Sequence, residues 1–203
     1  MIPRFPFALA LAAMVLSGCV SVDDPKTTAE IRPLNKGNSA GSGSMYIAGY
    51  AFAPPAFYDF CKRERRLCNS TGSAKVAGLT PARLAELKSV NQSVNARIKQ
   101  KLDSASTGKD DVWGLPSNAG DCEDFAILKK HELMKRGWPS SALLLTVVTY
   151  MGQGHVLLTV RTDQGDMVLD NRTNSVKAWS RTPYRFFARQ SQSKYGKWDK
   201  IGA

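Results

Sequence analysis

Three residues with the side chains of a nucleophilic triad follow one another along the chain. Cys122 lies within the run from Gly120 to Ala126, and His155 begins a later apolar run. Asp170 ends the apolar run after that. A cysteine attacks a carbonyl carbon as a thiolate, so it needs a base, and the base needs an acceptor that fixes its tautomer. The order Cys, His, Asp therefore makes these residues a candidate triad for acyl chemistry.

A predicted helix places Cys122 at its N-terminus. The helix spans about residues 121–136, and a glycine and a proline shortly afterwards would end it. The N-terminus of a helix carries partial positive charge and unpaired N–H groups, which stabilise a thiolate and a developing oxyanion. His131, which follows Lys129 and Lys130 in the middle of this helix, is interpreted as a solvated surface residue.

Three segments rich in Val, Leu and Thr are predicted strands, at residues 142–150, 155–162 and 167–170. Short glycine-containing turns separate them, which favours an antiparallel meander. In a meander the start of the second strand and the end of the third lie at the same edge, so His155 and Asp170 would meet there. Cys122 joins them if its helix N-terminus faces that edge. The expected architecture is α+β, with the geometry that papain-like and transglutaminase-like enzymes use.

An earlier segment is predicted to form an amphipathic helix that packs on the core. Thr80 and Pro81 are suited to the N-cap and the first turn. Apolar residues then recur at helical spacing, as Leu84, Leu87, Val90 or Asn91, Val94, Ile98 and Leu102. The polar residues 104–111 predict a loop after this helix.

Composition and charge limit the possible functions. With 203 residues, 43% of them hydrophobic, the chain can bury one domain core. The formal net charge of +11 favours acidic partners, which could be anionic lipid, nucleic acid or an acidic protein. The basic residues are scattered apart from a cluster between Lys62 and Arg66, so a solvated surface is the preferred interpretation. The N-terminal residues indicate export from the cytoplasm, and export disfavours nucleic acid as the partner.

Residues 1–18 have the layout of a secretory signal, with Arg4 followed by an apolar stretch. They lead into Leu-Ser-Gly-Cys ending at Cys19, which resembles the bacterial lipobox, in which the cysteine is lipidated. An ordinary signal peptide or a short membrane anchor remains an alternative, although the apolar run is shorter than the roughly 20 residues that a span needs. Val20 after the cysteine resembles outer-membrane rather than inner-membrane sorting.

Residues 19–44 are predicted to be a flexible tether, and residues 45–203 the folded domain. The tether is rich in Lys, Thr, Pro, Asn, Gly and Ser, which suits a flexible connection between a lipid and an enzyme. A disordered N-terminus without a role agrees with this composition equally well.

The cysteines of the predicted domain have different prospects. Cys61 and Cys68 flank a short segment in a chain expected in an oxidising compartment, so a disulfide is predicted. Zinc is the alternative, but the spacing exceeds the usual two to about four intervening residues. Cys122 is then unpaired, and it is either buried and inert or functional.

Several short motifs resemble one family, the bacterial transglutaminase-like cysteine proteinases. The motifs are Gly120 to Ala126, Gly154 to Leu157, Val168 to Asn171, Pro54 through Phe60, Cys61 with Cys68, Val90-Asn91 with Asn95, and Asp111 to Trp113 followed by Pro116. They occur in the family's order, and the similarity covers roughly Ile47 to Tyr195.

The resemblance implies a role for each residue. Cys122 would be the nucleophile, His155 the general base and then acid, and Asp170 the group that orients His155. The substrate would be a peptide bond in a protein, cleaved through an acyl-enzyme without any cofactor. Trp113 would line the site near the oxyanion. Singly, the triad residues could be a core thiol, a hydrogen-bonding histidine and a turn former, but their order within the family pattern favours catalysis.

Three carboxylates surround the thiol, those of Asp121, Glu123 and Asp124. They would raise the pKa of a neighbouring thiol unless something compensates their charge. In LapG-type members of the family this acidic run binds calcium, which prefers carboxylate oxygens. The resemblance thus implies a possible calcium site at these residues. Capping of the helix N-terminus by acidic side chains explains them equally well without a metal.

Two other functions stay open. A noncatalytic lipoprotein could use the same groove to bind an envelope protein. Alternatively, the acyl group could pass to an amine instead of water, as in transglutaminases and amidases. The preferred interpretation is a periplasm-facing cysteine peptidase, tied to the membrane through Cys19, that acts on a protein of the cell envelope.

Overall fold

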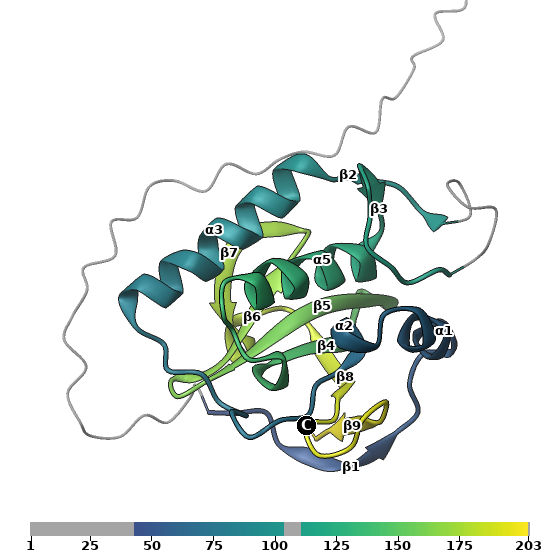
Figure 1. The fold of residues 1–203 in the computed structure, drawn as a ribbon. Coiled ribbons are helices and arrows are strands. Elements are labelled where there is room, and N and C mark those ends of the chain that lie inside the picture. Colours follow the sequence, from purple (N-terminus) through teal and green to yellow (C-terminus); the bar gives the residue numbers. More distant parts are fainter. Residues whose placement is uncertain (1–42, 104–110, 203) are drawn as a thin grey trace, which may run out of the picture. The chain divides into compact units, whose positions relative to one another are not determined.

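The computed structural model describes residues 43–103 and 111–202. A seven-stranded sheet, with every neighbouring pair antiparallel, has the order β1-β9-β8-β4-β5-β6-β7 (Figure 1). Its strands are β1 (Ile47–Ala51), β4 (Leu143–Tyr150), β5 (Gln153–Thr162), β6 (Gly165–Asp170), β7 (Thr173–Ala178), β8 (Arg185–Gln190) and β9 (Trp198–Ile201). A separate parallel pair consists of β2 (Lys99–Gln100) and β3 (Ala119–Gly120). The predicted α+β class is confirmed.

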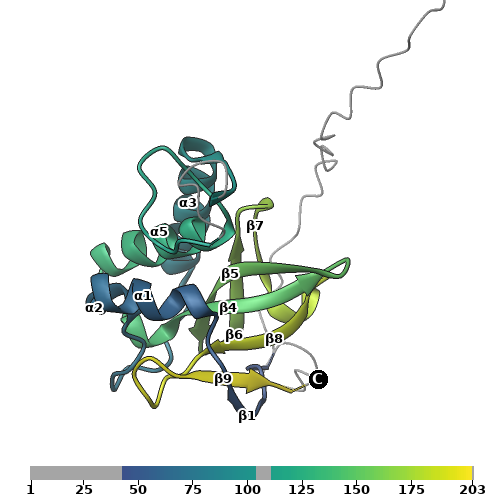
Figure 2. The same ribbon diagram turned by 90° about the vertical axis from the view of Figure 1, so that its right-hand side faces the viewer.

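The two longest helices of the described residues lie side by side over one face of the sheet (Figures 1 and 2). The helices are α1 (Pro55–Arg63), α2 (Arg65–Cys68), α3 (Pro81–Arg97) and α5 (Cys122–Lys135), with 3-10 turns η1 (Ser140–Ala142) and η2 (Trp179–Arg181). The main core fills the space between helices and sheet, where Leu87, Ile127 and Leu158 are fully buried. A smaller cluster, Val148, Leu157 and Val168, is built from the alternate strand positions, which face the other side.

The predicted meander is confirmed by β4, β5 and β6. The pairing sets Val148 opposite His155, and Leu158 opposite Leu169. The predicted N-cap also holds, because the Thr80 side chain accepts a hydrogen bond from the Arg83 N–H at 3.2 Å.

Two sequence-based expectations about the helices are wrong. The first amphipathic helix ends at Arg97, because Ile98 takes an extended conformation and the next residues pair as β2 with β3, leaving Leu102 64% exposed. The interpretation of His131 on α5 as a solvated surface residue is also wrong. His131 is half-buried and the preceding Lys129 and Lys130 are fully buried, since α5 packs against both α3 and strands β4 to β6.

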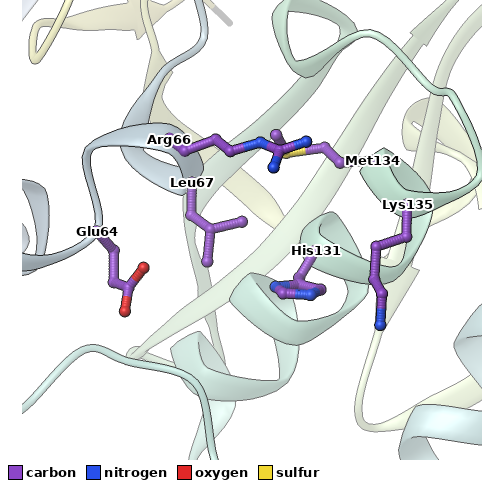
Figure 3. Close-up of a pocket in the computed structure, with 6 residues that line it drawn as sticks. All are labelled: Glu64, Arg66, Leu67, His131, Met134 and Lys135. Atoms are coloured by element: carbon purple, nitrogen blue, oxygen red, sulfur yellow. The ribbon is translucent and has the colours of Figure 1, made fainter.

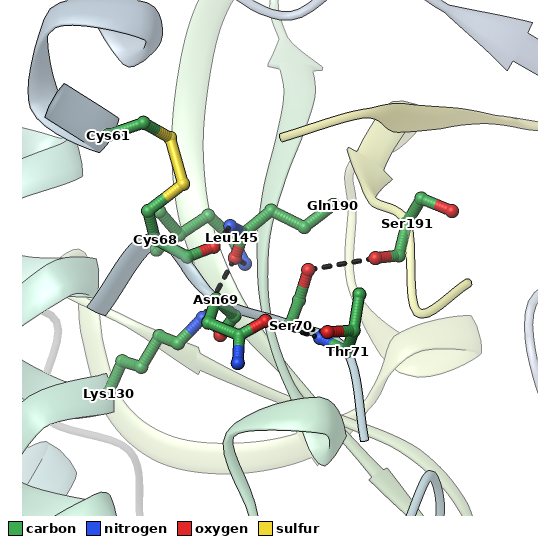
Figure 4. The surroundings of a disulfide bond; sticks show 9 residues. All are labelled: Cys61, Cys68, Asn69, Ser70, Thr71, Lys130, Leu145, Gln190 and Ser191. Atoms are coloured by element: carbon green, nitrogen blue, oxygen red, sulfur yellow. Dashed lines mark hydrogen bonds between the residues drawn. A yellow bond between two sulfur atoms is a disulfide. The ribbon is translucent and has the colours of Figure 1, made fainter. Parts of the chain in front are cut away.

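Cys61 and Cys68 form the predicted disulfide, with a Cα–Cα distance of 5.1 Å (Figure 4). Buried polar side chains fasten the segment after it to the sheet. Lys130 Nζ donates to the Asn69 carbonyl at 3.0 Å, and Gln190 Nε2 donates to the Cys68 carbonyl at 2.8 Å. The disulfide therefore belongs to a buried hydrogen-bonded junction between α2, α5 and β8.

Several expectations lie outside the described residues. They concern the signal segment 1–18, Cys19, most of the tether and most of the loop at 104–111. Within the described parts, no helix has the length and apolar character that crossing a membrane requires.

Candidate active site

Cys122 is the first residue of α5 and the one free cysteine of the described residues. Asp121 precedes it as the N-cap in an extended conformation, and the acidic side chains of Glu123 and Asp124 occupy the first turn. The sulfur lies against the edge of β5, because the Val156 N–H donates to Cys122 Sγ at 3.4 Å. The thiol donates in turn to Glu123 Oε2 at 3.3 Å.

The surroundings of Cys122 favour the protonated thiol. Burial raises the pKa of Cys122 far above its ordinary value, and the neighbouring charge of Glu123 raises it further. The hydrogen bond from Val156 opposes these two effects without cancelling them. Burial, together with the charge of Glu123, therefore favours the thiol at a position where a helix N-terminus would by itself favour a thiolate.

His155 and Asp170 form a buried hydrogen bond on neighbouring strands. His155 Nε2 lies 2.8 Å from Asp170 Oδ1, and the two residues are only 7% and 1% exposed. Val156, whose N–H contacts the sulfur, follows His155 directly. The structure thus brings the sulfur of Cys122 to the start of β5, beside the His155–Asp170 pair, where the meander places the start of its second strand and the end of its third.

Asp170 is held by donors from several segments. The Arg172 N–H donates to Oδ1 at 3.2 Å and the Tyr184 hydroxyl donates to Oδ2. Asn95 Nδ2, on α3, donates to the main-chain carbonyl of Asp170 at 3.0 Å. Burial alone would raise the pKa of Asp170, but hydrogen bonds from His155 and Tyr184 and the charge of His155 hold this pKa below its usual value. Asp170 is accordingly an ionised acceptor beside the imidazole.

The acidic residues near the thiol form a larger cluster than expected. Oxygen atoms of Asp103, Asp121 and Asp124 lie within 4.8 Å of one another, and so do those of Asp103, Asp111 and Glu123. The structure thus divides the three predicted carboxylates between two groups that share Asp103. Burial raises the pKa of Glu123, and the Asp121 carboxylate raises it further to about 10, because it accepts a hydrogen bond from the protonated Glu123.

Asp124 is positioned by two glycines. Gly114 N–H donates to Asp124 Oδ1 at 3.0 Å. A Cβ at Gly120 would lie 2.5 Å from Asp124 Oδ2 and 2.8 Å from its Cβ, so any larger residue would displace this side chain. Burial raises the pKa of Asp124 to about 7, although the Gly114 hydrogen bond opposes the shift.

Trp113 is buried in an aromatic cluster and is only 2% exposed. Its ring lies 5.7 Å from Phe57 and 6.2 Å from Trp198, measured between ring centroids. The indole N–H donates to Asp111 Oδ1 at 2.8 Å. Trp113 therefore links the acidic cluster to the core.

A cavity of about 120 Å³ lies between the α2 region and the C-terminal half of α5 (Figure 3). Its lining residues are Glu64, Arg66, Leu67, His131, Met134 and Lys135. His131 lies nine positions after Cys122 on α5, which corresponds to about 13 Å along the helix. We assign this cavity no part in the chemistry at Cys122.

The sequence model described as bacterial transglutaminase-like cysteine proteinase (BTLCP) matches residues 47–203. The chain belongs to this family. The cysteine proteinase chemistry of BTLCP proteins requires a free thiol, and in the described part of this member Cys122 supplies one.

Solved structures of LapG from Legionella pneumophila share the fold of this BTLCP protein. Calcium-bound LapG has 23% sequence identity and a TM-score of 0.50, over 74% of this chain and 84% of LapG. EGTA-treated LapG has 22% identity and a TM-score of 0.50, over 74% of this chain and 81% of LapG. Comparison with curated proteins found no match.

Sequence reasoning missed Asp103 and Tyr184 among the residues around the site. Asp103 follows the end of the first long helix, and Tyr184 precedes β8. Neither carries a local motif, since each reaches the site only through the folding of distant segments. Asp111 belongs to the motif that includes Trp113. Because it is distant from Cys122 in sequence, the motif did not indicate that Asp111 belongs to the acidic cluster.

Proposed function

We propose that this protein hydrolyses peptide bonds of a cell-envelope protein, with Cys122 as nucleophile, His155 as base and Asp170 as the residue that orients His155. The observation that carries the proposal is the buried hydrogen bond between His155 Nε2 and Asp170 Oδ1, next to the strand position that contacts Cys122 Sγ. With Nε2 bound to Asp170, Nδ1 is the ring nitrogen left to exchange a proton with the thiol.

The proposed reaction has two halves. In the first, His155 removes the thiol proton and Cys122 Sγ attacks the peptide carbonyl carbon, which gives a tetrahedral oxyanion. Imidazolium then protonates the leaving amine as the C–N bond breaks, and a thioester remains. In the second, His155 takes a proton from water, which attacks the thioester, and Cys122 leaves as a thiol. Asp170 stays ionised throughout and stabilises the imidazolium.

Donors for the oxyanion are available at the start of α5. The first N–H groups of a helix have no partner within it, and they point toward the developing negative charge. Trp113 remains our candidate for lining this side of the site. Because its indole N–H is donated to Asp111, any such contribution comes from the ring's packing and not from that donor.

Calcium is proposed to bind the acidic cluster. Asp121 Oδ1 is buried without a hydrogen-bond partner in the described structure, so this oxygen is available as a cation ligand. The donors would be carboxylate oxygens of Asp103, Asp111, Asp121, Glu123 and Asp124, which are hard ligands suited to Ca²⁺. Bound calcium would supply positive charge that offsets the carboxylates, so that the thiol of Cys122 loses its proton more readily. A LapG structure is described as calcium-bound.

We further propose that the enzyme is a periplasm-facing lipoprotein, tethered through Cys19 and sorted to the outer membrane. The proposed tether would join the domain at Met45. This residue is bound to the sheet, because its N–H donates to Asp166 Oδ2 on β6 at 2.8 Å. The membrane then confines the enzyme to substrates of the envelope, and nucleic acid is excluded by this location.

The experiment that tests the function compares wild type with Cys122→Ala on an envelope protein fraction, supplied with calcium. Mass spectrometry of the products is expected to show one protein converted to two fragments by wild type only. If one larger cross-linked species formed instead, the reaction would be acyl transfer to an amine and not hydrolysis. A protein bound by both forms without any mass change would favour the noncatalytic binding function.

A further inference from the structure

The two oxygens of the Asp170 carboxylate have different partners. Oδ1 accepts from His155 Nε2 and from the Arg172 N–H, at 2.8 and 3.2 Å. Oδ2 accepts from the Tyr184 hydroxyl. A carboxylate can rotate about its bond to Cβ, so the donor on Oδ2 determines whether Oδ1 remains directed at the imidazole. The only side-chain donor recorded for Oδ2 in the described structure is Tyr184.

Tyr184 also contacts the other partner of the pair. Its ring centroid lies 5.7 Å from that of His155, and a further 5.7 Å separates it from the ring of Tyr150. The residue lies between η2 and β8, far in sequence from both strands of the pair. The ring of Tyr184 thus packs near the imidazole of His155, and its hydroxyl binds the carboxylate of Asp170.

We infer that Tyr184 is a positioning residue of the active site, which fixes the Asp170 carboxylate so that His155 is protonated at Nε2 and presents Nδ1 to the thiol. The inference rests on the proposed triad. It extends the Cys-His-Asp set by a fourth side chain, which acts on the reaction only through Asp170 and His155.

The charge state of the phenol suits this role. Burial raises the pKa of Tyr184, and the hydrogen bond to Asp170 raises it further, so the hydroxyl keeps its proton and remains a donor. A cavity of about 260 Å³ adjoins Asp170 and Tyr184. Without the hydroxyl, water from this side would compete with His155 for the carboxylate, and the orientation of Asp170 would no longer be unique.

The test compares Tyr184→Phe with Tyr150→Phe in the full chain at one fixed calcium concentration. Each variant loses one hydroxyl, and the Tyr150 hydroxyl makes none of the hydrogen bonds to Asp170 recorded for the described residues. The first readout is the tautomer of His155 by NMR on ¹⁵N-histidine protein, which has only one other histidine, His131. The second is the rate of iodoacetamide labelling at Cys122, followed by peptide mapping. Thermal melting confirms folding.

The expected result is a single Nε2–H tautomer in wild type and Tyr150→Phe, and mixed tautomers in Tyr184→Phe. Labelling should slow about tenfold in Tyr184→Phe, the size expected for a hydrogen bond to a charged group, and less than about twofold in Tyr150→Phe. Equal tautomers or equal rates in the two variants would overturn the positioning role. A wild type that labels no faster than His155→Ala would instead refute the triad itself.

Discussion

His155 and Asp170 lie on adjacent antiparallel strands, with Nε2 and Oδ1 2.8 Å apart and both side chains almost inaccessible to solvent. The tight turn between β5 and β6 makes these residues neighbours although 15 positions separate them. Burial strengthens the interaction between imidazolium and carboxylate, because no solvent screens it. This arrangement makes Asp170 an effective stabiliser of a charged His155, which is what a general base requires.

We predict that reducing the Cys61–Cys68 disulfide destabilises the domain. The bond closes a short loop, for which the chain-entropy estimate is about 2 kcal/mol. The Cys122→Ala substitution removes the one cysteine of the domain that is not in the disulfide. Urea unfolding of this variant with and without reductant would measure the change in the free energy of unfolding. A Cys61→Ser, Cys68→Ser double variant serves as control and should not respond to reductant. Equal unfolding midpoints for Cys122→Ala in both conditions would contradict this prediction.

We predict that Lys129→Met stabilises the protein at neutral pH. Lys129 Nζ is buried without a hydrogen-bond partner in the described structure. Burial lowers the pKa of Lys129 to about 7, although Asp170 opposes the shift. In the unfolded chain Lys129 binds its proton below about pH 10, whereas in the folded protein it does so only below about pH 7. Lowering the pH from about 10 to 7 therefore decreases the free energy of unfolding. The gain from the substitution should therefore be a few kcal/mol larger at pH 7 than above about pH 10, where the amine is neutral in both states.

Urea unfolding at pH 7 and pH 10 measures this difference. Lys130→Met is the matched control, because Lys130 Nζ donates to the Asn69 carbonyl and to Gln190 Oε1, so that its removal takes a donor from both acceptors. Its gain at pH 7 should be smaller. A gain for Lys129→Met that is the same at both pH values would show that hydrophobic packing, and not the buried charge, is responsible.

We predict that calcium binds the acidic cluster and accelerates labelling of Cys122. Isothermal titration calorimetry should detect binding to wild type and binding at least about tenfold weaker to Asp121→Asn, since one charged ligand is lost. Asp199→Asn, which changes a carboxylate on β9, is the control and should bind as wild type does. Affinity should rise with pH through about 7, where Asp124 loses its proton. Absence of heat, with labelling unaffected by chelator, would eliminate the metal site.

The sequence was sufficient to predict the meander and the helix that carries Cys122, because the patterns concerned are local. The turns between β4, β5 and β6 and the apolar runs between them determine which strand ends meet. The end of α3 was predicted too late, because Ile98 continues the apolar spacing although its backbone is extended and leads into β2. The four further strands of the sheet were not predicted.

The environment of the site was less accessible from sequence than its reactive residues. His131 was interpreted as a solvated residue among charged neighbours, and only the packing of α5 against α3 and the sheet shows that it is half-buried and that Lys129 and Lys130 are fully buried. The contact of Tyr184 with Asp170 joins the segment before β8 to the end of β6 and depends on the sheet order, in which β8 pairs with β4. Such relationships arise from tertiary structure and leave no spacing in the sequence.

The most direct test of the proposed mechanism is the rate at which iodoacetamide labels Cys122 at mildly acidic pH with calcium present, in wild type, His155→Ala and Asp170→Asn. Peptide mapping identifies the labelled cysteine. If His155 activates the thiol and Asp170 orients His155, wild type labels rapidly at Cys122 and both variants label at least about tenfold more slowly. Slow labelling at the same rate in all three proteins would contradict the account, and Cys122 would then be an ordinary buried thiol.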